Sequence, residues 1–294
     1  MKALNFALPC LMLLLMAFSS DNFAQDKETI RWLGWVQSPN FITEGKFKGQ
    51  GIGDSLTNTL QLALPQYHHV NVISNAQRYN SLILEDNVCV AWAWIVPGSR
   101  PHRIHSRPVS LAPATGLITL KSKQHLFGTH GEVLSLAKLL KNPKIKLGYL
   151  TGMNYTKRVN DLLKQYQGKD NIHFSSRSGV EFSLDMLDTN RLDYFFGFSA
   201  QAIFDAKTKE IPNKYQFYNI EEIQNYTSMY THCSNSPIGK KVMKQVGEIL
   251  TDDILMDHLS NFEKWYGKIE KYREVFIDFV INQNSNELVT HPGE

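Results

Sequence analysis

Hydrophobic and polar positions follow two alternating patterns along the chain. Short runs rich in β-branched and aromatic residues predict strands, and apolar residues that recur every three or four positions predict helices. The predicted strands cover residues 29–35, 69–74, 88–94, 115–120, 144–150, 192–196 and 226–233. The predicted helices cover residues 54–64, 75–84, 133–140, 154–166, 178–187 and 237 to about 280. The chain therefore alternates strand and helix over most of its length.

Several of the predicted helices begin at residues that cap helices. Asp54 and Asn154 are suited to the N-cap, and Ser178 and Glu181 have the spacing of a capping box. Pro237 stands where a first helical turn accepts proline. These residues define four of the predicted helix starts.

The order of the elements predicts an α/β fold with two lobes. Strands that alternate with helices form parallel sheets covered by helices. The series falls into two sets, separated by extended segments at 115–120 and 226–233, so the chain is expected to cross between the lobes twice. We assign residues 25–115 and 226–283 to lobe 1, residues 116–225 to lobe 2, and residues 284–294 to a flexible tail. Ligands collect beyond the carboxyl ends of strands in such sheets, so the two lobes predict a cleft between them.

Composition and charge exclude several classes of protein. Of the 294 residues, 43% are hydrophobic and 20% are charged, which excludes general disorder. The 31 basic and 28 acidic residues leave a net charge of +3, so no nucleic-acid partner is expected. The sequence contains no GxSxG, HExxH or phosphate-loop signature. We therefore expect a globular protein of one large or two ordinary domains.

The amino terminus indicates export. Lys2 precedes an apolar run at residues 7–18, and small and polar residues follow it, as is typical of a secretory signal peptide. The run is shorter than the roughly 20 apolar residues that span a bilayer. Cleavage is expected after Ala24, with Ser19 as the alternative position, and an uncleaved membrane anchor is the other interpretation. Residues 1–24 are thus assigned to a signal peptide, and the mature protein is expected in the periplasm.

Two cysteines, Cys89 and Cys233, remain in the mature chain. An oxidising compartment permits a disulfide between them, and two buried free thiols are the other interpretation. His102 and His105 have the spacing of a metal-binding pair, but no third ligand follows at a suitable distance and Pro101 disfavours a helix there. We expect neither a metal site nor a cofactor.

Four segments carry a resemblance to a known family. They are SPNFITEGKFKGQGIGDSL (38–56), NVCVAWAWIVPGSRPHRIHSRPVS (87–110), KLGYLTGMNYTKRV (146–159) and LDMLDTNRLDYFFGF (184–198). In order and spacing they resemble the type II periplasmic solute-binding proteins, specifically the amino-acid-binding branch (family 3). The resemblance implies a two-lobed clamshell, each lobe a mainly parallel sheet flanked by helices, that closes on a small molecule by hinge motion. It also implies a disulfide between Cys89 and Cys233, because the family places the returning segment beside the central strand.

The same segments depart from the family where an amino acid would bind. Trp92 and Trp94 stand where family members have small hydroxyl residues or glycine. Ser99 occupies the position of the arginine that holds the ligand carboxylate, with Arg100 one residue late, and Phe198 replaces the carboxylate that holds the ligand ammonium. Leaving either ligand group unpaired in a dry cleft costs on the order of 1–3 kcal/mol. A simple α-amino acid is therefore not the expected ligand.

The ligand-binding residues are expected at the carboxyl ends of the strands. Trp92 and Trp94 lie two apart on one strand, so they share a face and would stack on a ligand, with ordinary core packing as the other interpretation. The turn at 151–154 opens a helix and suits an anion, or is an ordinary cap. Arg78 either reaches the pocket or is solvated. The full expected set is Gln37, Phe41, Arg78, Trp92, Trp94, Arg100, Thr151, Asn154 and Phe198.

These features predict extracytoplasmic binding of a small organic solute, without catalysis. The solute would have an aromatic, cyclic or alkyl part and an anionic or polar end. Its partner would be a membrane transporter, such as an ABC transporter, or a membrane-bound sensor, and the protein itself is expected to be a monomer. One alternative is an enzyme on the same fold, a dehydratase or a lyase, which needs a positioned carboxylate such as Glu44 or Glu181. The other is a ligand-free module that binds a protein partner.

Overall fold

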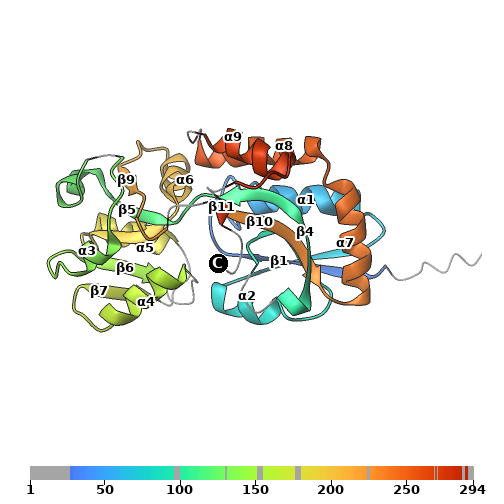
Figure 1. Cartoon of the computed structure of the whole chain (residues 1–294), viewed down its shortest axis with the longest axis horizontal. Helices are drawn as coiled ribbons and strands as arrows, with labels where there is room; N and C mark the ends of the chain where they lie inside the picture. The colour runs from blue at the N-terminus through green and yellow to red at the C-terminus, as the bar shows by residue number, and fades with distance from the viewer. Residues whose placement is uncertain are drawn as a thin grey trace, which may run out of the picture.

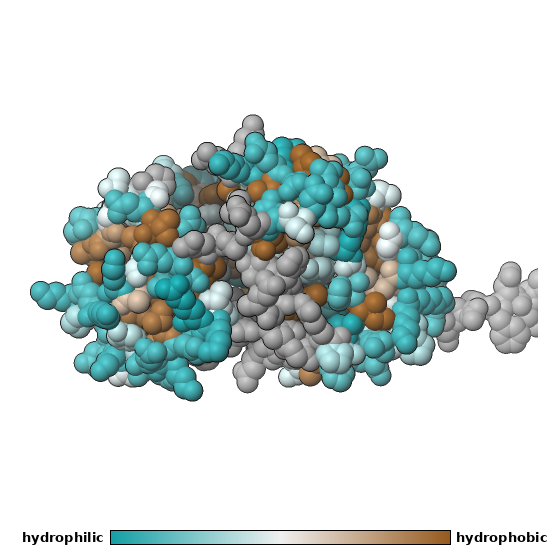
Figure 2. Space-filling model, in the orientation of Figure 1, coloured by the Kyte–Doolittle hydropathy of each residue, from teal (hydrophilic) through white to brown (hydrophobic). Residues whose placement is uncertain are grey.

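Two lobes lie side by side, each built on one β-sheet (Figure 1). The computed structural model describes residues 27–95, 100–129, 131–150, 155–175, 180–223, 226–267, 269, 271–286 and 289–290. The predicted signal peptide, Thr151, Asn154 and Ser178 lie outside these residues. Across the described ranges, no helix is both long and apolar enough to cross a membrane. The visible face of both lobes is mostly hydrophilic, with apolar residues scattered over it (Figure 2).

Lobe 1 contains both ends of the described chain. Its strands are β1 (Thr29–Trp35), β2 (His68–Ser74), β3 (Val88–Ala93), β4 (Arg103–Ala112), β10 (Tyr226–Ser234) and β11 (Val289–Thr290). They form a sheet of order β11-β10-β3-β1-β2, and β4 pairs with β10 as well. The helices of this lobe include α1 (Ile52–Ala63), α2 (Ala76–Leu82), α7 (Pro237–Ile249), α8 (Asp252–Tyr266) and α9 (Tyr272–Phe276).

Lobe 2 is formed by the middle of the chain. Its strands are β5 (Gly116–Leu120), β6 (Leu147–Leu150), β7 (Ile172–Ser175), β8 (Tyr194–Gly197) and β9 (Tyr215–Tyr218), in the order β7-β6-β8-β5-β9. Its helices include α3 (Leu136–Leu140), α4 (Lys157–Tyr166), α5 (Val180–Asp188) and α6 (Ser199–Lys209). Apolar side chains pack on both faces of this sheet, because successive residues of β8 point to opposite sides: Tyr194 and Phe196 belong to one cluster and Phe195 to the other.

The chain crosses between the lobes twice, from β4 to β5 and from β9 to β10 (Figure 1). Strands β1, β2 and β3 are parallel, as are β6, β7 and β8. Most pairs that involve the crossing strands run the other way: β10 is antiparallel to β3 and β4, and β5 is antiparallel to β8 and β9, whereas β10 and β11 are parallel. Each lobe is thus a mixed sheet with a parallel part of three strands, flanked by helices, in agreement with the predicted two-lobed α/β fold.

Two of the predicted helix starts are corrected by the structure. The first helix begins at Ile52, and Asp54 lies in its first turn, where its carboxylate accepts hydrogen bonds from the backbone N–H groups of Gly51 (3.0 Å) and Ile42 (2.8 Å). Helix α4 begins at Lys157 and its cap is the Thr156 hydroxyl rather than Asn154. Pro237 does occupy the first turn of α7, as predicted.

Several elements of the fold are absent from the prediction made from the sequence. Strands β4, β7, β9 and β11 and helix α6 were not predicted. The segment assigned to a flexible tail contains β11, whose residues Val289 and Thr290 pair with Tyr226 and Thr227 of β10. A short parallel pairing of this kind fixes part of the carboxyl-terminal segment to the sheet of lobe 1.

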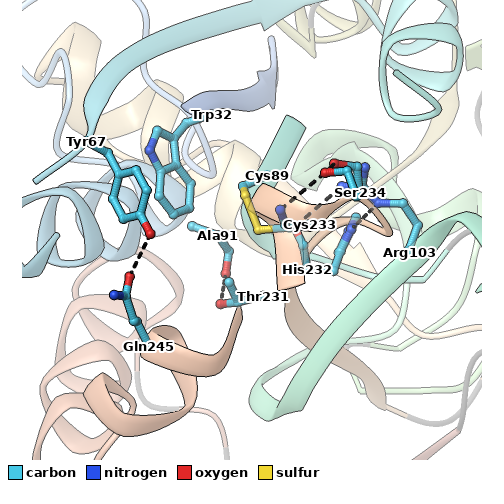
Figure 3. The surroundings of a disulfide bond; sticks show 12 residues. Trp32, Tyr67, Cys89, Ala91, Arg103, Thr231, His232, Cys233, Ser234 and Gln245 are labelled. Atoms are coloured by element: carbon cyan, nitrogen blue, oxygen red, sulfur yellow. Dashed lines mark hydrogen bonds between the residues drawn. A yellow bond between two sulfur atoms is a disulfide. The ribbon is translucent and has the colours of Figure 1, made fainter. Parts of the chain in front are cut away.

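A disulfide joins Cys89 in β3 to Cys233 in β10, which confirms the pairing that the resemblance implied (Figure 3). The two residues face one another across the antiparallel pair, with a Cα–Cα distance of 4.0 Å. On the same strands, the Thr231 hydroxyl donates to the carbonyl of Ala91 (2.7 Å). The bond links two parts of lobe 1 that are 144 residues apart in sequence.

Candidate functional site

Five aromatic rings gather where β1 and β3 end. Trp35, the last residue of β1, lies at the centre of the group. Its ring centroid is 4.9 Å from that of Phe41, 5.2 Å from Tyr79, 5.5 Å from Trp94 and 6.3 Å from Trp92. The cluster thus lies at the carboxyl ends of these strands, where ligands are expected in such sheets, although its rings are not among the residues that line the interlobe cavity described below.

Trp92 in β3 and Trp94, which directly follows this strand, have different environments within the cluster. Trp92 is 1% exposed and stacks against Trp35 with an interplanar angle of 17°, so in this conformation its ring has no surface to offer a solute. Core packing, the other interpretation of the sequence, describes its surroundings. Trp94 is only partly buried and packs edge-on to Trp35. Ligand contact by Trp94 stays a prediction.

Gln37 and Phe41 lie in the loop that follows β1. The Gln37 side-chain carbonyl accepts hydrogen bonds from Trp35 Nε1 (2.5 Å) and Asn40 Nδ2 (3.3 Å). Phe41 is buried within lobe 1, close to Gly53, where a Cβ atom would lie 2.3 Å from the ring. Phe41 therefore anchors the loop, and Gln37 is the residue that reaches the space between the lobes.

The remaining expected residues are dispersed. Arg78 is exposed in the first turn of α2, where its backbone N–H donates to Asn75 Oδ1 (2.8 Å). Arg100 begins a short 3-10 helix, and its side chain lies outside the described part, as do Thr151 and Asn154. Phe198 directly precedes α6 and packs against the core of lobe 1. Its role in ligand binding, like that of Arg78, stays a prediction.

A cavity of about 480 Å³ lies between the lobes. This volume falls within the range of about 300–1,000 Å³ that is typical of small-molecule sites. Lobe 1 contributes the segment after β1, and lobe 2 contributes α5 and α6. The lining residues are Val36, Gln37, Ser38, Thr43, Glu44, Gly45, Leu184, Gln201, Phe204, Asp205, Thr208 and Lys209.

Helix α6 places a stripe of side chains along this cavity. Gln201, Phe204, Asp205 and Thr208 are spaced by three and four residues, so they share one face of the helix. The Gln201 side-chain carbonyl accepts the backbone N–H of Phe198 (2.8 Å), which fixes the start of the helix. The face that lines the cavity therefore combines two polar groups, a carboxylate and an aromatic ring.

Asp205 brings a buried carboxylate to the cavity wall. Its side chain is 4% exposed, and Oδ1 lies 2.7 Å from Lys209 Nζ. Oδ2 is covered and has no hydrogen-bond partner within the described residues. Burial favours the neutral form of Lys209, but the hydrogen bond and charge of Asp205, helped by Asp185 and Asp188, outweigh it and raise the pKa of Lys209. The lysine therefore stays charged beside the carboxylate.

The lobes touch directly along one side of the cavity. The ring of Phe204 in α6 lies 5.5 Å from that of Trp265 in α8 and 6.4 Å from that of Phe47, centroid to centroid. An ion pair of 2.6 Å joins Lys46 of lobe 1 to Glu210 of lobe 2 at the surface. Helix α6 therefore belongs to lobe 2 but also contributes Phe204 to the hydrophobic core of lobe 1.

The sequence analysis did not identify α6 or its polar residues. The helix has a weak apolar periodicity, and Asp205 belongs to no motif. The available signal was the acidic residue seven positions after Phe198, two helical turns from the place where the resembling family has its carboxylate. Among the described residues, no group of three side chains is arranged to bind a metal ion.

No protein-family profile and no curated protein sequence matches the chain. Solved structures do match it. The "probable amino-acid ABC transporter extracellular-binding protein" YtmK from Bacillus subtilis is 16% identical with a TM-score of 0.55, covering 82% of this chain and all of that one. An ancestral arginine-binding protein bound to arginine is 14% identical with a TM-score of 0.58, covering 82% of this chain and all of that one.

A third similar structure is that of another ancestral binding protein. The ancestral amino acid-binding protein AncCDT-1, described as a precursor of cyclohexadienyl dehydratase, is 14% identical with a TM-score of 0.54, covering 81% of this chain and 95% of that one. At such identities the similarity shows the fold. The chain has the two-lobed fold of the type II periplasmic solute-binding proteins.

Proposed function

We propose that the protein binds a small organic solute between its two lobes, for transport or for sensing, and catalyses no reaction. The observation that supports this most directly is the cavity of about 480 Å³ whose walls come from both lobes. A solute held by both walls binds the closed arrangement better than an open one. Ligand binding would therefore shift the lobes toward closure, as differential affinity requires.

The chemistry of the walls favours a solute other than a simple α-amino acid. Phe198 stands where a carboxylate would hold the ligand ammonium, and it is partly buried against the core of lobe 1 instead. Trp94 offers a partly exposed aromatic surface beside the expected site. An aromatic surface with a few polar groups suits a ligand with an apolar body and a polar end.

An enzyme on this fold is the second candidate, and its support is the similarity to AncCDT-1. A dehydratase or lyase needs a carboxylate positioned at the reacting group. Glu44 lines the cavity but is exposed, and no described side chain holds it by a hydrogen bond or ion pair. Glu181 lies in α5, outside the side chains that the structure describes. Binding without catalysis is therefore the better-supported function.

We also propose that the protein is exported to the periplasm and that it has a partner in the membrane. The amino-terminal pattern supports export, and the solved structures of this fold include a binding protein of an ABC transporter. We propose that the mature chain is a monomer that delivers its solute to a transporter or presents it to a membrane-bound sensor.

A thermal-shift screen tests the proposed function. The mature protein is melted alone and with a panel of aromatic, cyclic and alkyl solutes that carry acidic, neutral or basic ends. At least one solute should raise the melting temperature of the wild type, and Trp94→Ala should reduce its affinity severalfold or more. Leu62→Ala, at an α1 position that is 82% exposed, serves as the control and should respond like the wild type. A panel without any shift, or shifts that Trp94→Ala leaves intact, would contradict the proposal.

A further inference from the structure

We propose that the interlobe cavity holds the protonated amino group of an organic amine, with the Asp205 carboxylate as its acceptor. This inference rests on the proposed function and names the chemistry of one end of the solute. The apolar residues Val36, Leu184 and Phe204 line the same cavity and would surround the alkyl or ring portion next to the amine.

The first support is the unused acceptor capacity of a buried carboxylate. A carboxylate accepts about four hydrogen bonds, and buried polar atoms are nearly always paired. Asp205 is 4% exposed, yet only its Oδ1 has a partner in the described part of the chain, at 2.7 Å from Lys209. Oδ2, the oxygen without a partner, is covered in this conformation, so an incoming ammonium reaches it through a side-chain rotation that also moves Oδ1 relative to Lys209.

The second support is the balance of charge on the wall. The charged lining residues are Glu44, Asp205 and Lys209, which together give a charge of −1. Lys209 is already neutralised by Asp205 and lies 4.0 Å from Asp185 as well. The excess negative charge of the wall is that of Glu44, because Asp205 and Lys209 offset one another, and it favours a cationic group. A carboxylate-bearing group would meet repulsion from Glu44.

The third support is the position of Asp205 relative to Phe198. The resembling family holds the ligand ammonium at the position of Phe198, which here is an apolar, partly buried side chain packed against the core of lobe 1. Asp205 lies two helical turns further along α6, between this helix and the loop after β1. The cation site is thus displaced toward residues 43–45, and a molecule that reaches it is longer than an α-amino acid bound at the strand ends.

Calorimetric titration with a matched series tests this inference. The probes are n-pentylamine, 1-pentanol and pentanoate, which share one apolar body and differ in the terminal group. The wild type should bind n-pentylamine at least tenfold more tightly than 1-pentanol, because hydrogen bonds to charged groups are the stronger class, and pentanoate more weakly than either. Asp205→Asn should abolish the preference for the amine.

Asp185→Asn is the matched control, since Asp185 lies near the same lysine but is 68% exposed and does not line the cavity. It should retain the preference within about twofold, because it leaves the Asp205 hydrogen bonds in place. Thr208→Phe places a ring over the cavity from an exposed helix position and should also abolish amine binding. If Asp205→Asn does not fold, as judged by near-ultraviolet circular dichroism, Thr208→Phe decides.

Two results would overturn the inference: equal affinity of the wild type for amine and alcohol, or a preference that survives both Asp205→Asn and Thr208→Phe. The outcome is separable from the proposed function. If a solute of the thermal-shift panel binds in a Trp94-dependent way but the calorimetric series shows no preference for the amine, the Asp205 site is refuted and the proposed function stands.

Discussion

Removal of the disulfide should destabilise lobe 1 strongly. Cys89 and Cys233 are 144 residues apart, and the loop that they close contains the whole of lobe 2. In the chain-entropy description, a loop of this length contributes about 5 kcal/mol at 25 °C, and measured gains are commonly about 2–4 kcal/mol. Both cysteines are buried in the centre of the sheet, and their replacement by alanine leaves the strand pairing in place. We therefore expect Cys89→Ala/Cys233→Ala to lose about 3–5 kcal/mol of unfolding free energy.

Tryptophan fluorescence follows this loss specifically, because all five tryptophans (Trp32, Trp35, Trp92, Trp94 and Trp265) belong to lobe 1. Unfolding in guanidinium chloride should show a midpoint lowered by about 1 M in the double variant, given the usual dependence of stability on this denaturant. Reduced wild type should behave like the variant. Coincident midpoints for all three samples, or two titratable thiols in the denatured, unreduced wild type, would refute the reasoning.

Three further changes test the packing. Burial lowers the pKa of His258 from 6.5 to about 4. Below pH 6.5 the unfolded chain therefore binds a proton at His258 that the folded chain does not bind. The contribution of His258 to the unfolding free energy, which is fully present above pH 6.5, should fall by about 2 kcal/mol at pH 5. His258→Leu should flatten this pH dependence in denaturant titrations, and an unchanged slope would argue against it. Gly53→Ala should cost about 1–3 kcal/mol, because its Cβ meets the Phe41 ring at 2.3 Å, whereas Gly247→Ala, with open space around it, should not destabilise. Phe204→Ala should lower the unfolding free energy by about 3 kcal/mol and raise hydrogen exchange in α6 and α8, because the ring packs against Trp265. Unchanged exchange in both helices would show that this contact contributes nothing to stability.

The sequence predicts most of the strands, including the crossing strands β5 and β10, but not β4, β7, β9 or β11. The predicted strand at 29–35 coincides with β1, since its apolar run is bounded by clear polar residues. Strand β4 contains His105, Arg107 and Pro108, and its middle positions are only partly buried, so its pattern does not distinguish it from a basic loop. Hydrogen bonding to β10 keeps this segment extended, and the local sequence pattern does not reveal that pairing.

The site shows a similar limit. Spacing alone places Trp92 and Trp94 on one face of a strand, but a strand covered on both sides gives no sign of which ring is exposed. The structure distinguishes them, because Trp35 covers Trp92. Asp205 could not be selected from sequence, since its significance depends on α6 packing beside a loop that is 160 residues earlier in the chain, around residue 45. Contacts between distant segments are the information that local patterns do not carry.

Native mass spectrometry tests the central claim, solute binding between the lobes, most directly. The mature protein is unfolded, refolded free of small molecules, and equilibrated with a small-molecule extract of the cells that produce it. We expect a noncovalent complex of one organic molecule per chain, present with the wild type and diminished with Trp94→Ala. The bare chain as the only species in every extract, or an equally abundant complex with the variant, would contradict it.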